Sequence, residues 1–307
     1  MSKYLTLFLN GCDGSRWNLT DETEGVLLRP GPQKFIDAPA RTFWLETSSG
    51  SSYQGMRFDR RDPVFSVQIY HPNPLVWADI DSRFRMALGM VGEDQFELEA
   101  HTSYGVRRLK MRLLTEPIAY ASADYEKKDP YITHDSTLGI SAACENPFWE
   151  SDPLEYTWTL SSGSSGEVTW QIENRGDVEV WWKAFATAPG YWTFQDRSYG
   201  QKIYAKTTPP FNRALDDADR DQWIPTLLAG EDCSIDTDPD EPTLVAANGA
   251  PVQARWQSNG FLYPIRPRLR PTDADAAFTA SVTGANPGAA VTLWVPRRYT
   301  RPFGVSV

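Results

Sequence analysis

The chain has 307 residues, of which 41% are hydrophobic and 23% charged, and its formal net charge is −10. This acidic balance repels a phosphate backbone, so it argues against a nucleic-acid partner. Its 23 prolines, 21 glycines and 13% aromatic residues favour many short strands joined by turns, with little helix. We expect a mainly β protein of two domains.

The cysteines and the apolar runs set further limits. Cys12, Cys144 and Cys233 are widely spaced and form no CxxC pair, which predicts free, buried thiols and no disulfide framework. The apolar run near the start is short and has no small-residue cleavage site after it, and no other run reaches the ~18 residues of a spanning helix. We expect a soluble chain with no membrane segment and no export signal.

Strand patterns dominate the first half. β-Branched and aromatic residues at 64–70 mark the clearest strand, which we expect to be central in its sheet. The Ser/Gly-rich stretch 47–52 is expected to form a hairpin loop. Further strands are predicted at 4–9 and 41–45, and as a hairpin at 93–100 and 107–114.

One helix is expected, between Asp79 and Met90. Its apolar positions recur at intervals of four, at Ile80, Phe84 and Leu88. Its candidate caps are Asp79, Asp81 and Ser82, whose side chains can accept the free amides of a helix start.

A basic run follows in the second strand of the predicted hairpin, at Arg107, Arg108, Lys110 and Arg112. These residues alternate with Leu109, Met111 and Leu113. In an acidic chain, we interpret the run as one solvated strand face and not as a nucleic-acid patch.

Residues 125–130 are polar and end in Pro130, which is typical of an inter-domain connection. We place the domain boundary between residues 138 and 139. Residues 1–138 then carry 16 basic and 19 acidic side chains, net −3, and residues 139–307 carry 14 and 21, net −7. Neither part is basic.

Nine of the twelve tryptophans lie after this boundary, as expected for a compact sandwich core. Strand-like alternation on both sides of the turn cluster 173–177 predicts that residues 170–194 form the spine of a β-sandwich. Trp181, Trp182 and Trp192 could instead form a sugar-stacking platform, but core is the favoured interpretation. Other strands are predicted at 157–160, 167–173, 178–186, 193–206 (two), 234–236, 243–245, 278–282 and 290–295, with a charged excursion at 207–225.

No motif indicates catalysis or metal binding. His71, His101 and His134 lie beside no nucleophile motif, and no two of the histidines and cysteines are close enough in sequence for a zinc pair. Residues 236–240 imitate the start of a calcium loop, but Glu241 and Ala247 stand where glycine and a bidentate glutamate are needed.

Glycosidases use two catalytic carboxylates, and the distance between them is set by the fold and not by their spacing in the chain. The candidates for such a pair would be Glu145, Asp152 and Glu155, beside Phe148 and Trp149, although a polar rim around a buried aromatic pair is the favoured interpretation. We assign no catalytic, cofactor-binding or metal-binding residue, and we expect neither a cofactor nor enzymatic activity.

Several stretches together resemble the distal tail proteins of long, flexible-tailed bacteriophages (siphoviruses), especially the minor tail proteins of phages of actinobacteria. They occur in order over most of the chain, at residues 10–11, 17–19, 57, 64–70, 84–88, 107–113, 143–149, 173–177, 188–190, 235–237 and 298–304.

This resemblance implies an N-terminal belt domain at 1–138, a split β-barrel with one short helix, and a galectin-like β-sandwich at 139–307. It implies a non-enzymatic virion protein that forms a ring of six at the tail tip. The implied neighbours are the tail tube protein, the tail-associated or tip proteins and the tape measure protein. The alternative is a carbohydrate-binding or glycan-cleaving β-sandwich protein. If the chain forms a ring, we expect its first domain to close that ring.

Overall fold

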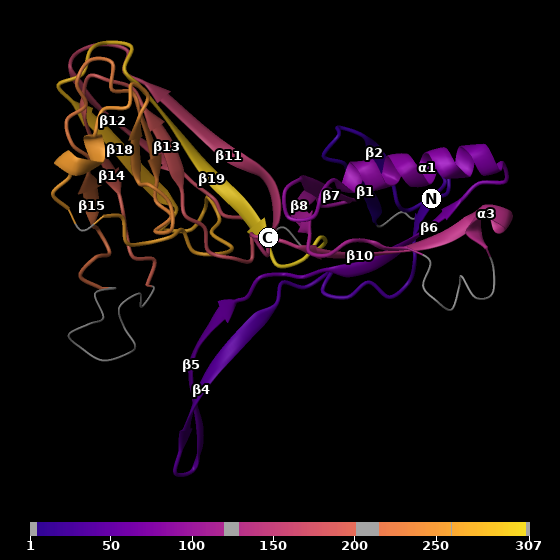
Figure 1. Ribbon diagram of the computed structural model, residues 1–307. Helices are drawn as coiled ribbons and strands as arrows, with labels where there is room; N and C mark the ends of the chain where they lie inside the picture. Colours follow the sequence, from indigo (N-terminus) through magenta and orange to yellow (C-terminus); the bar gives the residue numbers. More distant parts are fainter. Residues whose placement is uncertain (1–4, 120–128, 201–214, 259, 305–307) are drawn as a thin grey trace. The chain divides into compact units, whose positions relative to one another are not determined.

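The computed structural model describes residues 5–119, 129–200, 215–258 and 260–304 (Figure 1). The chain forms two compact units: unit 1 holds residues 1–151 and 299–305, and unit 2 holds residues 152–298. Most of the regular structure in the described residues is strand, and the helices there are α1, α3 and one 3-10 turn. The mainly β fold predicted from composition is therefore confirmed.

Unit 1 is built on one antiparallel sheet in the order β2-β1-β7-β8-β10-β6-β3. The backbone N–H of Leu28 in the last strand donates to the carbonyl of Leu19, just after β2, at 2.9 Å, so the two edges of the sheet approach each other. The strands are β1 (Thr6–Asn10), β2 (Arg16–Asn18), β3 (Val26–Leu28), β6 (Val64–Tyr70), β7 (Gln95–Thr102), β8 (Gly105–Leu113), β9 (Ile118–Ala119, paired with β10) and β10 (Asp135–Ala143).

Strand β6 has the predicted bounds and lies between β3 and β10, as its composition indicated. Period-two alternation buries Phe65, Val67 and Ile69 on one face of this strand. The predicted hairpin is confirmed as β7 and β8, which pair along their whole length. These strands enclose the core of unit 1, together with the buried side of α1.

Helix α1 (Pro74–Leu88) begins before the predicted start at Asp79. The side chain of Asn73 accepts the N–H of Leu75 at 3.0 Å, and Pro74 at the first helical position lacks the N–H that a helix start leaves unpaired. The helix ends at Gly89, whose φ of 71° favours glycine. A short helix, α3 (Pro130–Thr133), was not predicted.

The unit boundary differs from the predicted one. Residues 138 and 139 lie inside β10, where Leu138 pairs with Val67 of β6. The two units instead divide between Ser151 and Asp152. Residues 125–128 of the expected connection lie outside the described part, and Pro130 begins a helix of unit 1.

Arg107 does not belong to the solvated basic face that the sequence predicted. Period two places it with Leu109 on the core side of β8, and only 3% of it is exposed. Its guanidinium lies 3.6 Å from the ring centroid of Tyr299 and donates to the carbonyls of Arg301 at 2.8 Å and Gly304 at 3.2 Å. The residue therefore binds the end of the chain.

Arg61 is a second buried arginine with the same role. It is fully buried, and its guanidinium donates to the carbonyls of Phe35 at 3.3 Å, Ile36 at 3.4 Å and Thr300 at 3.0 Å. Burial lowers the pKa of its side chain to about 10. Residues 299–304 thus return to unit 1, where two buried cations bind their backbone carbonyls.

Unit 2 is a two-layer sandwich, visible at one end of Figure 1. One layer has the order β17-β16-β13-β19-β11 and the other β12-β18-β14-β15. The strands are β11 (Trp149–Thr159), β12 (Ser165–Gln171), β13 (Lys183–Ala186), β14 (Tyr191–Gln195), β15 (Asp221–Trp223), β16 (Cys233–Asp236), β17 (Leu244–Ala246), β18 (Ala277–Thr283) and β19 (Ala290–Tyr299), with the 3-10 turn η1 (Val252–Arg255). The galectin-like topology implied by the resemblance stays a prediction.

The segment 173–177 connects the two layers and is not the turn of a hairpin. Strand β12 before it and strand β13 after it belong to different sheets. In the predicted strand at 178–186, only Lys183–Ala186 form a regular strand. Before it, Val180 makes an isolated bridge to Ile265. Of the two strands predicted at 193–206, β14 is present and residues 201–206 lie outside the described part. The excursion at 207–225 contributes strand β15, and its residues 207–214 also lie outside the described part.

Trp182 confirms the prediction of a tryptophan core. It is 1% exposed, and its ring centroid lies 5.4 Å from that of Phe194, 4.8 Å from that of Phe261 and 5.2 Å from that of Phe278. Trp182 directly precedes β13, whereas Phe194 and Phe278 lie in strands of the other layer. This tryptophan therefore packs between the two sheets.

Trp182→Ala should lower the free energy of unfolding by about 3 to 5 kcal/mol, because it leaves a cavity between the sheets. The measurement is denaturant unfolding followed by circular dichroism. The control is Trp44→Ala, at a side chain that is 58% exposed, with an expected change within about 0.5 kcal/mol. Equal losses in the two variants would contradict the core assignment.

Arg61→Ala should cost about 2 to 5 kcal/mol, because the truncation leaves a void and removes the partner of three carbonyls. The same unfolding measurement applies. Arg41→Ala is the matched control, since its side chain is 60% exposed and pairs only at the surface with Asp59, which is worth at most about 1 kcal/mol. A neutral Arg61→Ala would show that the chain end does not depend on this residue.

Candidate assembly interface

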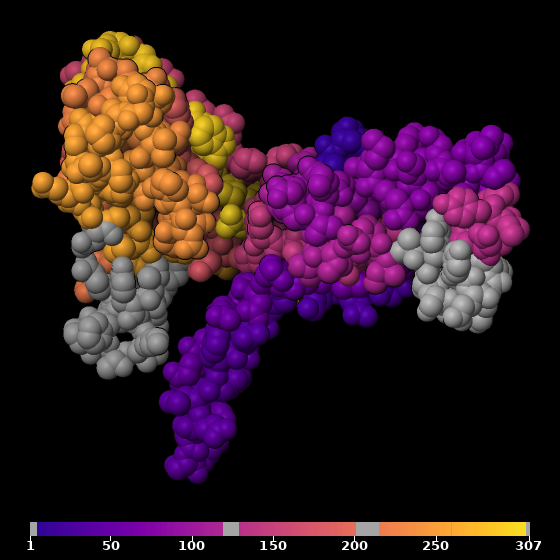
Figure 2. Space-filling model, in the orientation of Figure 1, coloured from indigo at the N-terminus to yellow at the C-terminus, as the bar shows by residue number. Residues whose placement is uncertain are grey.

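Unit 1 carries a hairpin that pairs with no other strand of the described residues. Strands β4 (Ala40–Thr47) and β5 (Gly50–Phe58) form a two-stranded sheet of their own, which projects from the body of the unit (Figures 1 and 2). The sequence predicted a loop at 47–52, but Thr47 pairs with Gly50 and the turn is confined to Ser48 and Ser49.

One face of the hairpin is aromatic. Trp44 lies opposite Tyr53, and their ring centroids are 5.3 Å apart. Met56 pairs with Thr42, and Trp44 donates its Nε1–H to the hydroxyl of Thr42, so Met56 belongs to the same face. Trp44, Tyr53 and Met56 are 58%, 53% and 51% exposed. We call these three residues the aromatic face.

The opposite face is also uncovered. It carries Phe43 and Leu45, which are 42% and 58% exposed, and the guanidinium of Arg57 lies 5.5 Å from the ring centroid of Phe43. Every residue of β4 is exposed. An isolated two-stranded hairpin is marginally stable in water, and an exposed apolar patch usually marks an interaction site. The hairpin is therefore a candidate for contact with another subunit.

This surface was not predicted from the sequence, although a signal was present. Phe43, Trp44 and Leu45 are three consecutive apolar residues, and one face of a strand can bury only every second residue. Such a run on a strand implies either burial on both faces or an apolar surface open to a partner.

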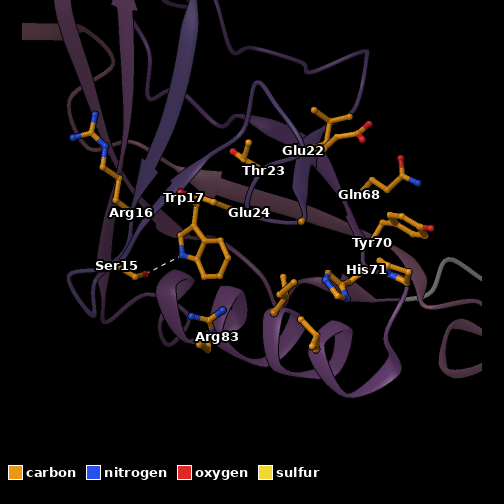
Figure 3. Close-up of a pocket in the computed structure, with 15 residues that line it drawn as sticks. Ser15, Arg16, Trp17, Glu22, Thr23, Glu24, Gln68, Tyr70, His71 and Arg83 are labelled. Carbon is orange, nitrogen blue, oxygen red and sulfur yellow. Dashed lines mark hydrogen bonds between the residues drawn. The ribbon is translucent and has the colours of Figure 1, made fainter.

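Unit 1 also contains a cavity of about 570 Å³, between β2, the loop after it, the end of β6 and one side of α1 (Figure 3). Tyr70 and Val76 contribute most of the exposed apolar surface, because Trp17 and Ile80 are buried behind the lining; Trp17 donates its Nε1–H to the hydroxyl of Ser15 at 2.9 Å. The guanidinium of Arg83 lies 5.5 Å from the Trp17 ring centroid. Gly25 lies at the cavity with a φ of 76°, and a Cβ there would approach Ile80 to 2.8 Å.

The charged groups of the cavity leave an acidic excess. Both arginines that line it have carboxylate partners, Arg16 with Glu99 at 2.6 Å and Arg83 with Asp79 at 3.0 Å. Among the described residues, Glu22 and Glu24 of the lining take part in no ion pair. These two carboxylates favour a partner with positive or donor groups.

The three histidines belong to unit 1. His71 lines the cavity and accepts the backbone N–H of Asn73 at 3.1 Å through Nδ1. His101 contacts Glu99, and His134 ends helix α3.

The three cysteines are free, but the prediction that all are buried is wrong for Cys12. It is exposed in the turn between β1 and β2, and its thiol donates to the carbonyl of Met86 at 3.3 Å. Burial raises the pKa of Cys144 to about 12 and that of Cys233 to about 11, so these two thiols remain protonated at neutral pH.

The candidate glycosidase acids make structural contacts. Glu145 pairs with Arg112 at 3.1 Å, and Glu155 accepts the Nε1–H of Trp294 at 3.3 Å. Glu145 belongs to unit 1, whereas Asp152 and Glu155 belong to unit 2.

The aromatic residues beside these acids pack inward. The ring centroid of Phe148 lies 4.7 Å from that of Phe58, and Trp149 is fully buried. Trp182 and Trp192 are also buried and cannot stack on a sugar, while Trp181 is half-buried.

The calcium-like stretch folds as a turn stabilised by its own carboxylates. Asp236 accepts the N–H of Asp238 at 3.1 Å and pairs with Lys183 at 2.6 Å. Across the described residues, no group of three or more His, Cys, Asp or Glu side chains is placed to hold a metal ion. No helix within the described ranges is long and apolar enough to cross a membrane.

The fold is similar to that of a phage distal tail protein. The chain aligns with the Dit protein (gp19.1) of phage SPP1 with a TM-score of 0.56 and 10% identity, covering 96% of this chain and 99% of that one. No protein-family model matches the chain.

In sequence, the chain is similar to minor tail proteins. It is 26% identical to minor tail protein Gp27 of Mycobacterium phage D29 over 350 aligned residues and 26% identical to Gp27 of Mycobacterium phage L5 over 339. Both alignments cover 97% of this chain and 97% of the relative. The resemblance to phage minor and distal tail proteins that the sequence motifs indicated is confirmed.

We expect the amides of β4 and β5 to exchange rapidly with deuterium in the isolated chain, because no described residue covers the exposed faces of these strands and the opening of the hairpin costs little. On assembly, their exchange should slow by at least about tenfold. Amide exchange followed by mass spectrometry measures both states, and β6, paired on both sides, serves as the protected reference. A hairpin as protected as β6 in the isolated chain would contradict this expectation.

Proposed function

We propose that this chain is a structural protein of the phage tail tip, and that six copies form a ring between the tail tube and the tip or baseplate proteins used for host attachment. The observation that carries the proposal is the β4–β5 hairpin, which exposes apolar side chains on both faces and pairs with no other strand in the part of the chain that the structure describes. Such a hairpin gains stability when a neighbouring subunit covers it.

The similar proteins support this role. The relatives in phages D29 and L5 are minor tail proteins, and the SPP1 Dit protein is described as a paradigm of the hub of the adsorption apparatus in phages that infect Gram-positive bacteria. These are structural proteins, so the proposal includes no enzymatic activity. The site of action is the distal end of the tail in the virion.

Unit 1 closes the ring in this proposal, because the hairpin belongs to it. Unit 2 remains available to other tip proteins. The proposed partners are further copies of this chain, the tail tube protein, the tail-associated or tip proteins and the tape measure protein. The acidic charge of −10 argues against nucleic acid as a partner. The buried tryptophans of unit 2 give no support to the sugar-binding alternative.

The mass of the purified protein tests the ring. A ring of six should have a mass of six times the 34.6 kDa of one chain, or about 208 kDa, measured by native mass spectrometry with and without the tail tube protein. Trp44→Ser combined with Tyr53→Ser should leave monomers, because it removes the aromatic face. Leu228→Ser, at a residue of unit 2 that is 56% exposed, is the control and should leave the ring intact. If the wild-type protein stayed monomeric both with and without the tail tube protein, the proposed ring would be wrong.

A further inference from the structure

The layer of unit 2 formed by β12, β18, β14 and β15 has an outer face that is turned away from the core (Figure 1). We propose that this outer face binds a neutral saccharide, with Tyr191 and Trp223 against the flat side of a pyranose ring. The site belongs to unit 2 alone, so it does not depend on the proposed ring.

Strand register places a group of hydroxyls on the outer face. Ala280 of β18 is fully buried, so Thr279 and Ser281 on either side of it lie on the outer side of the strand. Thr169 of β12 pairs with Thr279, and Thr193 of β14 pairs with Ser281, so these threonines share that side. The hydroxyls of Thr169 and Thr279 are 3.0 Å apart, and none of the four residues is buried. Each hydroxyl can donate to a sugar oxygen or accept from a sugar hydroxyl.

Tyr191 and Trp223 add an aromatic surface to the same face. Thr193 pairs with Trp223, and Tyr191 lies two positions before Thr193, so both rings are on the outer side. The ring planes are 25° apart and the centroids are 6.0 Å apart, so the rings are offset and each leaves part of its surface uncovered. The face of an aromatic ring is electron-rich and attracts the weakly positive C–H groups of a sugar.

Three charged side chains border the hydroxyls. Glu167 lies in β12 and Asp221 in β15, the two edge strands of the layer, and Arg197 follows β14. Partial burial raises the pKa of Asp221, the charge of Glu167 raises it further and that of Arg197 lowers it, so the three charges interact across the face. Within the described ranges, none of these side chains makes an ion pair or a hydrogen bond, and Nε of Arg197 is buried without a partner.

A neutral saccharide fits this set of groups. A pyranose has a flat side of C–H groups and a rim of hydroxyls, which match the aromatic surface and the polar groups around it. Sugar hydroxyls can donate to the two carboxylates, and a sugar oxygen can accept the buried N–H of Arg197 and so remove the cost of leaving it unpaired. Two carboxylates against one guanidinium leave the face acidic, which repels an anionic ligand.

The site is distinct from the tryptophan platform considered from the sequence alone. Trp182 and Trp192 are buried in the core and take no part in it. Trp223, which the outer face presents, was predicted only as part of the charged excursion at 207–225.

Saturation-transfer NMR on the full chain tests the site. The probes are D-glucose, D-galactose and D-mannose at about 50 mM, because a small ligand on an open face binds with a Kd on the order of millimolar. At least one probe should receive saturation from the protein, and D-glucuronate should bind more weakly than D-glucose. Trp223→Ala should raise the Kd by at least about tenfold. The control is Trp294→Ala, at a half-buried tryptophan on the outer face of the other layer, which should leave the Kd unchanged.

A second variant separates a lost contact from a lost fold. Asp221→Ala removes an exposed carboxylate and should raise the Kd by at least about tenfold with an unchanged melting temperature. Asp240→Ala removes the same charge from the exposed turn after β16 and should change neither quantity. Transfer to none of the three neutral sugars, transfer that survives both Trp223→Ala and Asp221→Ala, or tighter binding of D-glucuronate would overturn the site. Each of these results would leave the proposed ring standing, because its mass is measured separately.

Discussion

The return of the chain end to unit 1 is the constraint on which the rest of the structure depends. Arg61 and Arg107 are both almost fully buried, and both donate to backbone carbonyls between Thr300 and Gly304. A buried cation is costly unless its donors find acceptors, and this segment supplies one carbonyl to Arg61 and two to Arg107, although Nε of Arg61 has no partner among the described residues. Unit 1 is complete only after β19 has left the sandwich, and within the described residues the chain therefore passes between the units at 151–152 and again at 298–299.

The return of the chain from unit 2 to unit 1 at residues 298–299 is a long-range feature, and it separates the parts of the fold that the sequence could predict from those that it could not. Strand β6, the β7–β8 hairpin and the Trp182 core follow from local periodicity, because each buries one face of a short segment. The domain boundary and the role of Arg107 depend on residues almost two hundred positions away, and no local pattern carries that information. The basic run in β8 was interpreted by residue type, whereas strand parity places Arg107 on the core side.

The assembly surface was harder to predict for a different reason. The pattern 41–45 was sufficient to predict a strand, but not to show that this strand would lack neighbours. Exposure is a property of the whole fold: the same three apolar residues would be core if a third strand lay beside β4. The cavity is still less accessible to prediction, since its walls come from β2, the loop after it, β6 and α1.

An uncovered apolar hairpin must also be protected from pairing with itself. Two exposed edges offer unpaired N–H and C=O groups, which would let hairpins stack edge to edge into filaments. The register of β4 and β5 shifts between Phe43 and Trp44, and Gly55 opposite has a φ of 146°. A bulge bends and twists a strand and so disrupts a straight edge. Glu46 faces Ser51 near the tip, which keeps the end polar. The hairpin therefore disfavours edge pairing and leaves its side chains as the surface that a partner recognises.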